Sequence, residues 1–343
     1  MSEEHVLEYS GAFRLVNKIA EGGMAAVYEA QQLGPEGFAK RIALKVIHPE
    51  YAQQHDFLQL FIDEAKLSAN LLHGNIVQIY QLGEVGGEYF IAMEFIQGPT
   101  LRAVIDRHRE LGIAIPATLA AYVASRVCRA LDFAHNFVLS GERLDIVHRD
   151  VSPGNVMATW DGHIKLADFG IAKAQTSIDP TAKDGMRLGK KHYMSPEQLL
   201  GLDVDARSDV FSTGVVLYEL LALDPLFHED LTLFAVEEVA MQPLPDLRQR
   251  ISDLDERLGA ILNRALAREP ANRFTAAAMG RALDDWIASQ HELASPDRLQ
   301  AHLASIFPTT YQARSASKNV DTDFSFLRNA RKQRPGLLGK LFG

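Results

Sequence analysis

Residues 146–170 have the sequence IVHRDVSPGNVMATWDGHIKLADFG. Two apolar runs flank the pair Asp161-Gly162, which is typical of a tight hairpin turn, so we predict a small hairpin over residues 156–166. A hairpin returns the chain to the edge from which it started. It therefore brings the polar residues at its two ends, Asn155 and Asp168, to one small volume.

The polar residues around this hairpin suit chemistry on a phosphate group. Asn155 and Asp168 offer two oxygen ligands with open positions, which Mg²⁺ uses when substrate phosphates and water complete its shell. Asp150 is a third, separate carboxylate that can accept a proton from an attacking hydroxyl. Taken singly, Asp150 and Asn155 fit loop caps and Asp168 fits a solvated turn. Together, at this spacing, they favour a magnesium site beside a proton acceptor.

The chain changes character near residue 97. Before it, short apolar runs alternate with glycine-containing turns, which predicts a small antiparallel sheet; residues 56–72 instead show helical spacing. After it the pattern is mostly helical, with a long helix from Pro116 to about Phe137, another over residues 206–222, and three more before about residue 290. We therefore predict an α+β chain in which a small sheet lobe with one helix joins a larger, mainly helical lobe through a connector near residues 96–99.

Composition excludes several classes of protein. A net charge of −9, from 35 Lys and Arg against 44 Asp and Glu, argues against general affinity for nucleic acid. The single cysteine, Cys128, rules out an internal disulfide and favours a reducing compartment. The acidic start, MSEEHVLEYSG, lacks the basic and apolar regions of a secretory signal. The most apolar long stretch, residues 209–227, is interrupted by polar residues and predicts a buried helix, so we expect a cytoplasmic protein without a membrane span.

The central stretch resembles the HRD…N and DFG elements of eukaryotic-type protein kinases, and the other parts of that family follow in order. IAEGGMAAVYEA resembles the glycine-rich loop, IALKVI the strand that carries the phosphate-pairing lysine, and FIDEAKLSANLLHGNIV the helix that carries its glutamate. AMEFIQGPTL resembles the hinge, YMSPEQ the end of the activation segment, and SDVFSTGVVLYEL the central helix of the large lobe. In EPANRF, Arg273 would pair with Glu197. The match covers roughly residues 10–290 and is most similar to bacterial serine/threonine kinases, especially the groups abundant in myxobacteria.

The resemblance implies a two-lobed protein kinase fold, with an N-lobe over residues 1–96 and a C-lobe over residues 97–290. It also implies the cofactors ATP and Mg²⁺ and protein substrates that carry serine or threonine. Lys45 would hold the α- and β-phosphates, and Glu64 would hold Lys45. Asp168 and Asn155 would bind the metal, and Asp150 would orient the substrate hydroxyl and accept its proton. His148 is interpreted as a structural histidine.

The resemblance also implies a nucleotide pocket built from apolar side chains and backbone groups. Val27, Ala43 and Met157 would sandwich the adenine, while the backbone at Glu94 and Ile96 would bind its edge. The implied nucleotide-binding set is completed by the phosphate-loop residues, the hinge methionine and the charged groups: Ala20, Gly22, Gly23, Met93, Lys45, Glu64 and Asp168. Without the family, the apolar members would simply be core residues.

Two departures from the family pattern affect the expected chemistry. The glycine-rich loop has Ala20, Gly22 and Ala25 where the family usually has three glycines, so we expect looser closure over phosphate. Ser152 occupies the position of a lysine that most serine/threonine kinases use near the transferred phosphoryl group, and Lys190 occupies the position of a threonine in the activation segment. We hypothesise that Lys190 restores the missing positive charge as a catalytic residue; the alternative is a solvated loop lysine.

The remaining predictions concern regulation and the C-terminus. Arg149 before the catalytic aspartate implies a phosphorylated activation segment, so we expect autophosphorylation, with self-association as its route, at Thr176, Ser177 or Thr181. Residues 291–310 predict a short amphipathic helix docked on the C-lobe, opened by Ser295-Pro296. From residue 311 to 343 the chain has seven Lys and Arg against two Asp, a basic tail that fits either a solvated end or docking to anionic lipid or an acidic partner.

Two function classes follow from these observations. The first is a serine/threonine protein kinase that uses ATP and Mg²⁺. The alternative is a pseudokinase, a nucleotide-binding scaffold that keeps the fold but transfers phosphate weakly or not at all. Pseudokinases usually lose one of the residues that correspond to Lys45, Asp150, Asn155 and Asp168, and all four are present here. A kinase of small molecules or of tyrosine is less well supported, although the missing loop lysine removes one marker against tyrosine.

Overall fold

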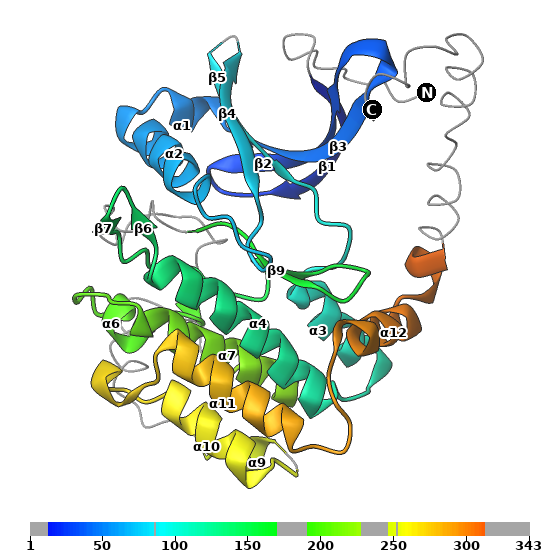
Figure 1. Ribbon diagram of the computed structural model, residues 1–343, viewed down its shortest axis with the longest axis vertical. Coiled ribbons are helices and arrows are strands. Elements are labelled where there is room, and N and C mark those ends of the chain that lie inside the picture. The colour runs from blue at the N-terminus through cyan, green and yellow to red at the C-terminus, as the bar shows by residue number, and fades with distance from the viewer. Residues whose placement is uncertain (1–12, 86, 170–190, 228–245, 252, 313–343) are drawn as a thin grey trace, which may run out of the picture.

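The computed structural model describes residues 13–85, 87–169, 191–227, 246–251 and 253–312, which form two lobes joined by a connector (Figure 1). The smaller lobe holds a five-stranded antiparallel sheet of order β1-β2-β3-β5-β4. A 3₁₀ turn over Pro35–Gly37 separates β2 from β3. The strands of the sheet are β1 (Phe13–Glu21), β2 (Ala25–Leu33), β3 (Ala39–Ile47), β4 (Ile79–Val85) and β5 (Glu88–Glu94). The expected α+β, two-lobed architecture is confirmed.

Two helices follow β3, α1 (Pro49–Ala52) and α2 (His55–Ser68). Helix α2 packs on the sheet through Phe61 and Ala65, which join an apolar cluster with strands β3 and β5. The helix expected over residues 56–72 ends earlier, at Ser68. The side chain of Asn70 donates to the carbonyl of Lys66, satisfying a carbonyl that a longer helix would have used.

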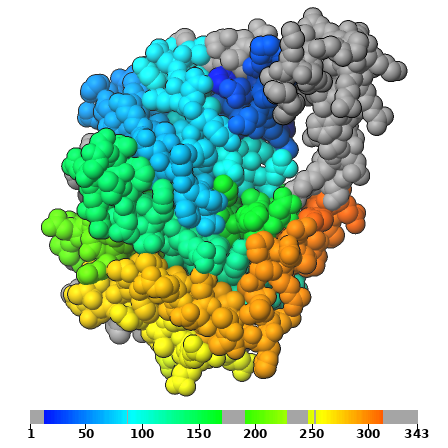
Figure 2. Space-filling model, viewed as in Figure 1, coloured from blue at the N-terminus to red at the C-terminus, as the bar shows by residue number. Residues whose placement is uncertain are grey.

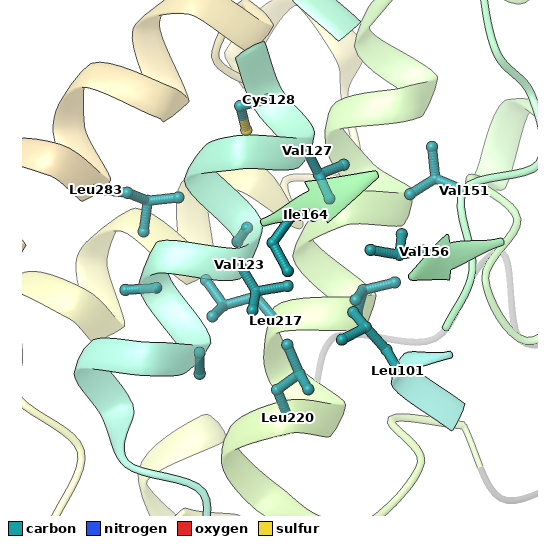
Figure 3. Packing of buried hydrophobic residues seen from close by; sticks show 14 of the residues in the cluster. Leu101, Val123, Val127, Cys128, Val151, Val156, Ile164, Leu217, Leu220 and Leu283 are labelled. Atoms are coloured by element: carbon teal, nitrogen blue, oxygen red, sulfur yellow. The ribbon is translucent and has the colours of Figure 1, made fainter. Parts of the chain in front are cut away.

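The larger lobe is built around two buried helices, α4 (Ala117–His135) and α7 (Arg207–Ala222). Figure 3 shows Val123 and Val127 of α4 close to Leu217 of α7 and Ile164 of β9. Residues of α7 are buried almost all round the helix. Full burial of such an aliphatic side chain contributes about 1.5–3 kcal/mol, so this core holds the C-lobe together. The free thiol of Cys128 lies inside this core.

Further elements surround this pair. In the C-lobe they are α3 (Leu101–Leu111), α6 (Pro196–Leu199), α9 (Leu247–Arg250), α10 (Glu256–Ala265), a 3₁₀ turn (Pro270–Asn272) and α11 (Ala276–Ala288). A hairpin, β6 (Val138–Leu139) and β7 (Glu142–Arg143), follows α4 where sequence patterns gave no indication of strands. Its turn has positive φ at Ser140 (54°) and Gly141 (88°), as a tight hairpin needs.

The predicted central hairpin forms as strands β8 (Val156–Ala158) and β9 (Ile164–Leu166), with Val156 opposite Leu166. The connector lies directly on β8, because the amide of Ala158 donates to Pro99 and the amide of Trp160 donates to Gln97. A Cβ on Gly98 would sit 1.9 Å from the carbonyl oxygen of Ala158, so only glycine permits this approach. The connector between the lobes is therefore fixed to the hairpin that precedes Asp168.

A last described helix, α12 (Pro296–Ile306), packs on the C-lobe through Leu299, Leu303 and Ile306. Figure 2 shows this orange segment against the green surface of the β8–β9 hairpin. The contacts lie at both ends of the helix. Trp160 meets Phe307 edge-on with ring centroids 5.9 Å apart, and Gly162 lies so close to Pro296 that a Cβ would be 1.8 Å from its carbonyl oxygen.

A pair of histidines also joins α12 to α3. The Nδ1 of His108 donates to the carbonyl of Ile113 at 3.0 Å, so its Nε2 is the acceptor for the Nε2–H of His302, 2.9 Å away. The His108 ring is therefore neutral in this arrangement, and burial lowers the pKa of both His108 and His302. Among the helices in the described part of the chain, none has both the length and the apolar character that a membrane crossing requires.

Candidate active site

The site begins with a lysine that reaches two carboxylates on separate elements. Lys45 lies on β3, opposite Val27 of β2 and Ile91 of β5. Its Nζ is 2.9 Å from Oε1 of Glu64 on α2 and 3.0 Å from Oδ1 of Asp168, the residue that follows β9 by two positions. Three distant segments thus meet at one ammonium group. The resemblance implied the pairing with Glu64, whereas the contact with Asp168 was not predicted.

Electrostatics keep this lysine charged. Burial acts to lower the pKa of Lys45, but the negative charges of Asp168 and Glu64 outweigh it and hold the pKa above its ordinary value. The ammonium group is therefore present over the whole physiological range, and it can exchange carboxylate partners for phosphate oxygens without changing protonation.

The loop over residues 148–155, called the catalytic loop below, precedes β8. It is anchored to a buried acid that the sequence had not indicated. Asp209, in the first turn of α7, is fully buried and accepts the amides of His148 (2.8 Å) and Arg149 (2.7 Å). It also accepts Nε2–H of His135 at 2.8 Å. Arg149 has a positive φ of 63°, a strained conformation for a residue other than glycine. The hydrogen bonds that these amides donate to Asp209 hold the strained backbone in place.

His148 uses both ring nitrogens on the backbone. Its Nε2 donates to the carbonyl of Ala167 at 3.0 Å, and its Nδ1 accepts the amide of Asp150 at 3.2 Å. The ring is fully buried, and this burial lowers its pKa. This neutral ring links the catalytic loop to the segment before Asp168, consistent with its interpretation as a structural histidine.

Asn155 connects the proposed proton acceptor to the proposed metal ligands. Its Nδ2 donates to the backbone carbonyl of Asp150 (2.8 Å) and to Oδ2 of the same residue (3.0 Å). The amide of Ala167 donates to the carbonyl of Asn155 at 2.8 Å, which places Asp168 next along the chain. Because Nδ2 faces Asp150, the amide oxygen of Asn155 is turned away from it and remains available as a ligand.

The side-chain oxygens of Asn155 and Asp168 fit a magnesium ion whose coordination shell also includes phosphate oxygens. The protein offers an amide oxygen of Asn155 and a carboxylate of Asp168, both hard oxygen ligands. No cluster of three or more His, Cys, Asp or Glu suited to a metal occurs within the described ranges. A magnesium ion here would therefore need oxygens from a nucleotide and water, which is how Mg²⁺ is usually held at phosphoryl-transfer sites.

The residues expected around adenine line up at the junction of the lobes. Ala43 pairs with Met93 across β3 and β5, and Met157 of β8 forms an isolated bridge with Thr100 beside the connector. Ile96 is buried. The side chain of Glu94 points to β9, where its Oε2 binds Nζ of Lys165 at 2.8 Å. This ion pair links β5 of the N-lobe to β9, a contact that the sequence had not suggested.

The phosphate loop closes through a backbone hydrogen bond from Gly22 to the carbonyl of Ala25 at 2.9 Å. Gly23 lies in this turn, and Ala20 pairs with Val27 across β1 and β2. Ala25 is buried at the start of β2. The substituted loop therefore retains the strand-turn-strand shape over the site.

The stretch over residues 191–199, called the platform below, is fixed to the C-lobe by charge pairs. Glu197 and Arg273 form a two-pronged ion pair with distances of 2.6 and 2.8 Å, both side chains buried. Burial acts to raise the pKa of Glu197, but hydrogen bonds from Arg273 and Ser208 bring it below its ordinary value. The pairing implied by the resemblance is present in the structure.

A second charge cluster fixes the platform from the other side. Glu219 of α7 is 2% exposed and binds Arg102 (2.8 Å) and Arg109 (3.0 Å) of α3. The hydroxyl of Tyr193 in the platform contacts both Glu219 and Arg102. Burial raises the pKa of Tyr193, so the phenol stays protonated and donates to the carboxylate. In the sequence, Glu219 had only interrupted an apolar helix.

Ser152 is buried beside Asp150, and its carbonyl accepts the amide of Asn155. Lys190 and the candidate phosphorylation sites Thr176, Ser177 and Thr181 lie outside the described residues. The exchange of lysine between positions 152 and 190 therefore stays a prediction, as does autophosphorylation. The basic tail from residue 313 onward also lies outside the described part.

Comparison with known proteins gives consistent matches. The family model for the protein kinase domain matches residues 13–284. The tyrosine-protein kinase MasK of Myxococcus xanthus is 38% identical over 288 residues, covering 83% of this chain and 44% of MasK. The serine/threonine-protein kinase PknB of Mycolicibacterium smegmatis is 36% identical over 294 residues, covering 84% and 44% respectively. The crystal structure of the PknI kinase domain of Mycobacterium tuberculosis matches with a TM-score of 0.61 and 29% identity, over 83% of this chain and 99% of that one. The chain spans less than half the length of these two curated relatives.

Proposed function

The chain belongs to the protein kinase family, and we propose that it transfers the γ-phosphoryl group of ATP to serine or threonine hydroxyls of proteins, with Mg²⁺ as the metal. The observation that carries the proposal is the meeting of Lys45 with both Glu64 and Asp168, at 2.9 and 3.0 Å. This contact ties the small lobe to the segment after β9. A nucleotide-binding scaffold would use the same three charges to hold ATP, so the phosphate-transfer test below separates the two functions.

Each residue has a defined task in this proposal. Lys45, held by Glu64, is positioned to bind phosphate oxygens with a permanent positive charge. Asp168 and Asn155 would hold Mg²⁺, which supplies neutralisation of charge on the phosphates when it is bound. Asp150 would orient the substrate hydroxyl and accept its proton. The hydrogen bond from Asn155 to Oδ2 of Asp150 keeps that carboxylate in one orientation.

Two kinds of acceptor hydroxyl are candidates, because the relatives are named for different acceptor residues. PknB is named as a serine/threonine kinase and MasK as a tyrosine kinase. The platform and its ion pairs are compatible with a protein substrate of either kind. Ser152 keeps tyrosine as a candidate, since the lysine whose presence would mark a serine/threonine kinase is absent from this position. We give serine and threonine priority, and tyrosine is the second candidate.

The test is phosphate transfer from labelled ATP with Mg²⁺, followed by identification of the labelled amino acid. Purified wild type is compared with Asp150→Asn, and with Asp203→Asn as a matched change at an exposed aspartate. We expect label on serine or threonine in wild type and Asp203→Asn, and a loss of about a thousandfold in Asp150→Asn. Label on tyrosine alone would replace the serine/threonine assignment. ATP binding without transfer in the wild type would support the scaffold.

Two further proposals, one on catalysis and one on regulation, use the same assay. If Lys190 supplies the charge missing at Ser152, Lys190→Ala lowers the transfer rate by about a hundredfold, and activity within a few-fold of wild type refutes the exchange. Mapping of phosphopeptides from active protein tests Thr176, Ser177 and Thr181. Active protein that carries no phosphate at any of these three residues refutes autophosphorylation there.

A further inference from the structure

Gln198 links the platform to the catalytic loop through both ends of its amide. It is the last side chain of the first turn of α6, where its Oε1 accepts the amide of Ser195 at 3.1 Å. Its Nε2 points the other way and donates to the backbone carbonyl of Arg149, also at 3.1 Å. Arg149 lies 49 positions earlier in the chain, immediately before Asp150.

The acceptor of this bond belongs to the peptide that orients Asp150. Arg149 has a φ of 63°, and its amide is held by Asp209 at 2.7 Å. The next amide, that of Asp150, donates to Nδ1 of His148 at 3.2 Å. The carbonyl of Arg149 is the remaining polar group of this strained peptide, and Gln198 binds it. The peptide between Arg149 and Asp150 is thus held by His148 and by the platform, and the peptide before it is held by Asp209 of α7.

Helix capping alone does not explain a glutamine here. Ser195 and Gln198 form a capping box, in which glutamate serves as well as glutamine because only an acceptor is needed. A glutamate would place a carboxylate oxygen against the carbonyl of Arg149, where the structure has an N–H donor. The position therefore uses the acceptor for the cap and the donor for the catalytic loop.

We propose that Gln198 is a positioning residue, which sets the orientation of Asp150 according to the position of the substrate platform. This inference rests on the proposed function, in which Asp150 receives the proton of a hydroxyl that the platform presents. Gln198 touches no reacting group in this scheme. It acts by holding the peptide before Asp150, so its loss affects the transfer step more than ATP binding.

The test compares Gln198→Glu, which keeps the acceptor for Ser195 and loses the donor, with Gln198→Met, which loses both. Gln290→Met is the matched control. The Nε2 of Gln290 also donates to a backbone carbonyl, that of Trp286, but this local contact at the end of α11 involves neither the platform nor the catalytic loop. We expect both variants at position 198 to lower kcat by about tenfold, with KM for ATP and the Tm close to wild type, because misplacement of a catalytic group affects the transition state most. The control keeps the wild-type kcat.

Hydrogen exchange supplies a readout that does not depend on activity. Peptides covering residues 146–155 should take up deuterium faster in both variants at position 198, since the hold on the strained peptide is loosened. Unchanged exchange, measured well below the Tm of each variant, overturns the proposal. So does a Gln198→Glu enzyme with wild-type kcat, because the cap alone would then explain the residue. An inactive wild type would instead count against the proposed function, and the exchange data would still decide the role of Gln198.

Discussion

The site combines two regions that are held in different ways. The catalytic loop over residues 148–155 is fixed by backbone hydrogen bonds to Asp209, which is fully buried in α7. The cluster of Lys45, Glu64 and Asp168 is held by charge-assisted hydrogen bonds between side chains that are 17%, 13% and 40% exposed. The first region is part of the folded core, whereas the second can exchange partners when a nucleotide arrives. In the proposed function, the rigid half would hold the proton acceptor and the adaptable half would hold the phosphates.

The largest expected effect comes from the rigid region. Asp209→Asn keeps the shape but replaces one acceptor oxygen by an N–H donor facing the buried amides of His148 and Arg149. We expect the free energy of unfolding to fall by about 3 kcal/mol in urea titrations, since a buried charge-assisted network loses a partner. Asp203→Asn, at an exposed aspartate, should change it by less than about 0.5 kcal/mol. An Asp209→Asn protein as stable as wild type would remove the distinction between the two regions.

In the adaptable region the effect should be on rate, with little change in stability. Glu64→Gln leaves an oxygen near Lys45 but removes the charge that holds its ammonium group. We expect kcat/KM to drop by about tenfold with a Tm close to that of wild type, because the ion pair is partly solvated. A large fall in Tm would show that this cluster is structural, like the catalytic loop. Glu50→Gln, at an exposed glutamate outside the cluster, is the control.

The next effect is the dependence of stability on pH, which partly or fully buried histidines in several parts of the fold should cause. Burial lowers the pKa values of His73, His108, His148 and His302 below their ordinary value of 6.5. Below pH 6.5 the unfolded chain therefore binds more protons than the folded chain. The contribution of these histidines to the free energy of unfolding is fully present above pH 6.5, and it decreases as the pH falls toward their pKa values in the folded state. Urea titrations should show a loss of about 1 kcal/mol or more between about pH 7.5 and 5.5. His302→Gln should reduce this loss, whereas the exposed His291, changed to Gln, should not.

The smallest effect is expected at the ion pair between the lobes. Lys165→Met keeps the apolar stem but removes the charge that binds Glu94 beside the connector, where the side chains are 15% and 27% exposed. We expect the Kd for ATP to rise about two- to threefold, since a partly exposed pair contributes about 0.2–1 kcal/mol. Arg143→Met removes the exposed pair with Asp145 and should leave nucleotide affinity unchanged. An equal effect of the two variants would show that the bridge between the lobes has no role in binding.

Local patterns in the sequence predicted the elements that have local causes. The Asp161-Gly162 turn forms, with a φ of 79° at Gly162, and the long helices begin within a residue of their expected starts. The pairing of Lys45 with Glu64 followed only from the resemblance, and the contact of Lys45 with Asp168 was not predicted, because no local pattern links positions 123 residues apart. Hairpin β6–β7 is too short for a strand period to be visible.

The main residues that the sequence did not predict as part of the site are two buried acids, Asp209 and Glu219. Asp209 and Glu219 lie in one apolar helix, and sequence periodicity shows them only as interruptions. Their partners come from elements far along the chain: His148 and Arg149 for Asp209, and Arg102 with Arg109 for Glu219. A charged residue inside a buried helix implies a compensating partner, since an unpaired buried charge is very costly. That rule would have marked both acids as organising residues, although it names no partner.

The position of α12 has a consequence for exchanging parts between kinases. The family match ends at residue 284, yet Trp160 of the β8–β9 hairpin touches Phe307 and, through its amide, the connector at Gln97. A chimaera joined at residue 284 would leave this indole and the C-lobe side chains that cover Leu303 open to water. The unit that can be transplanted intact therefore extends through α12.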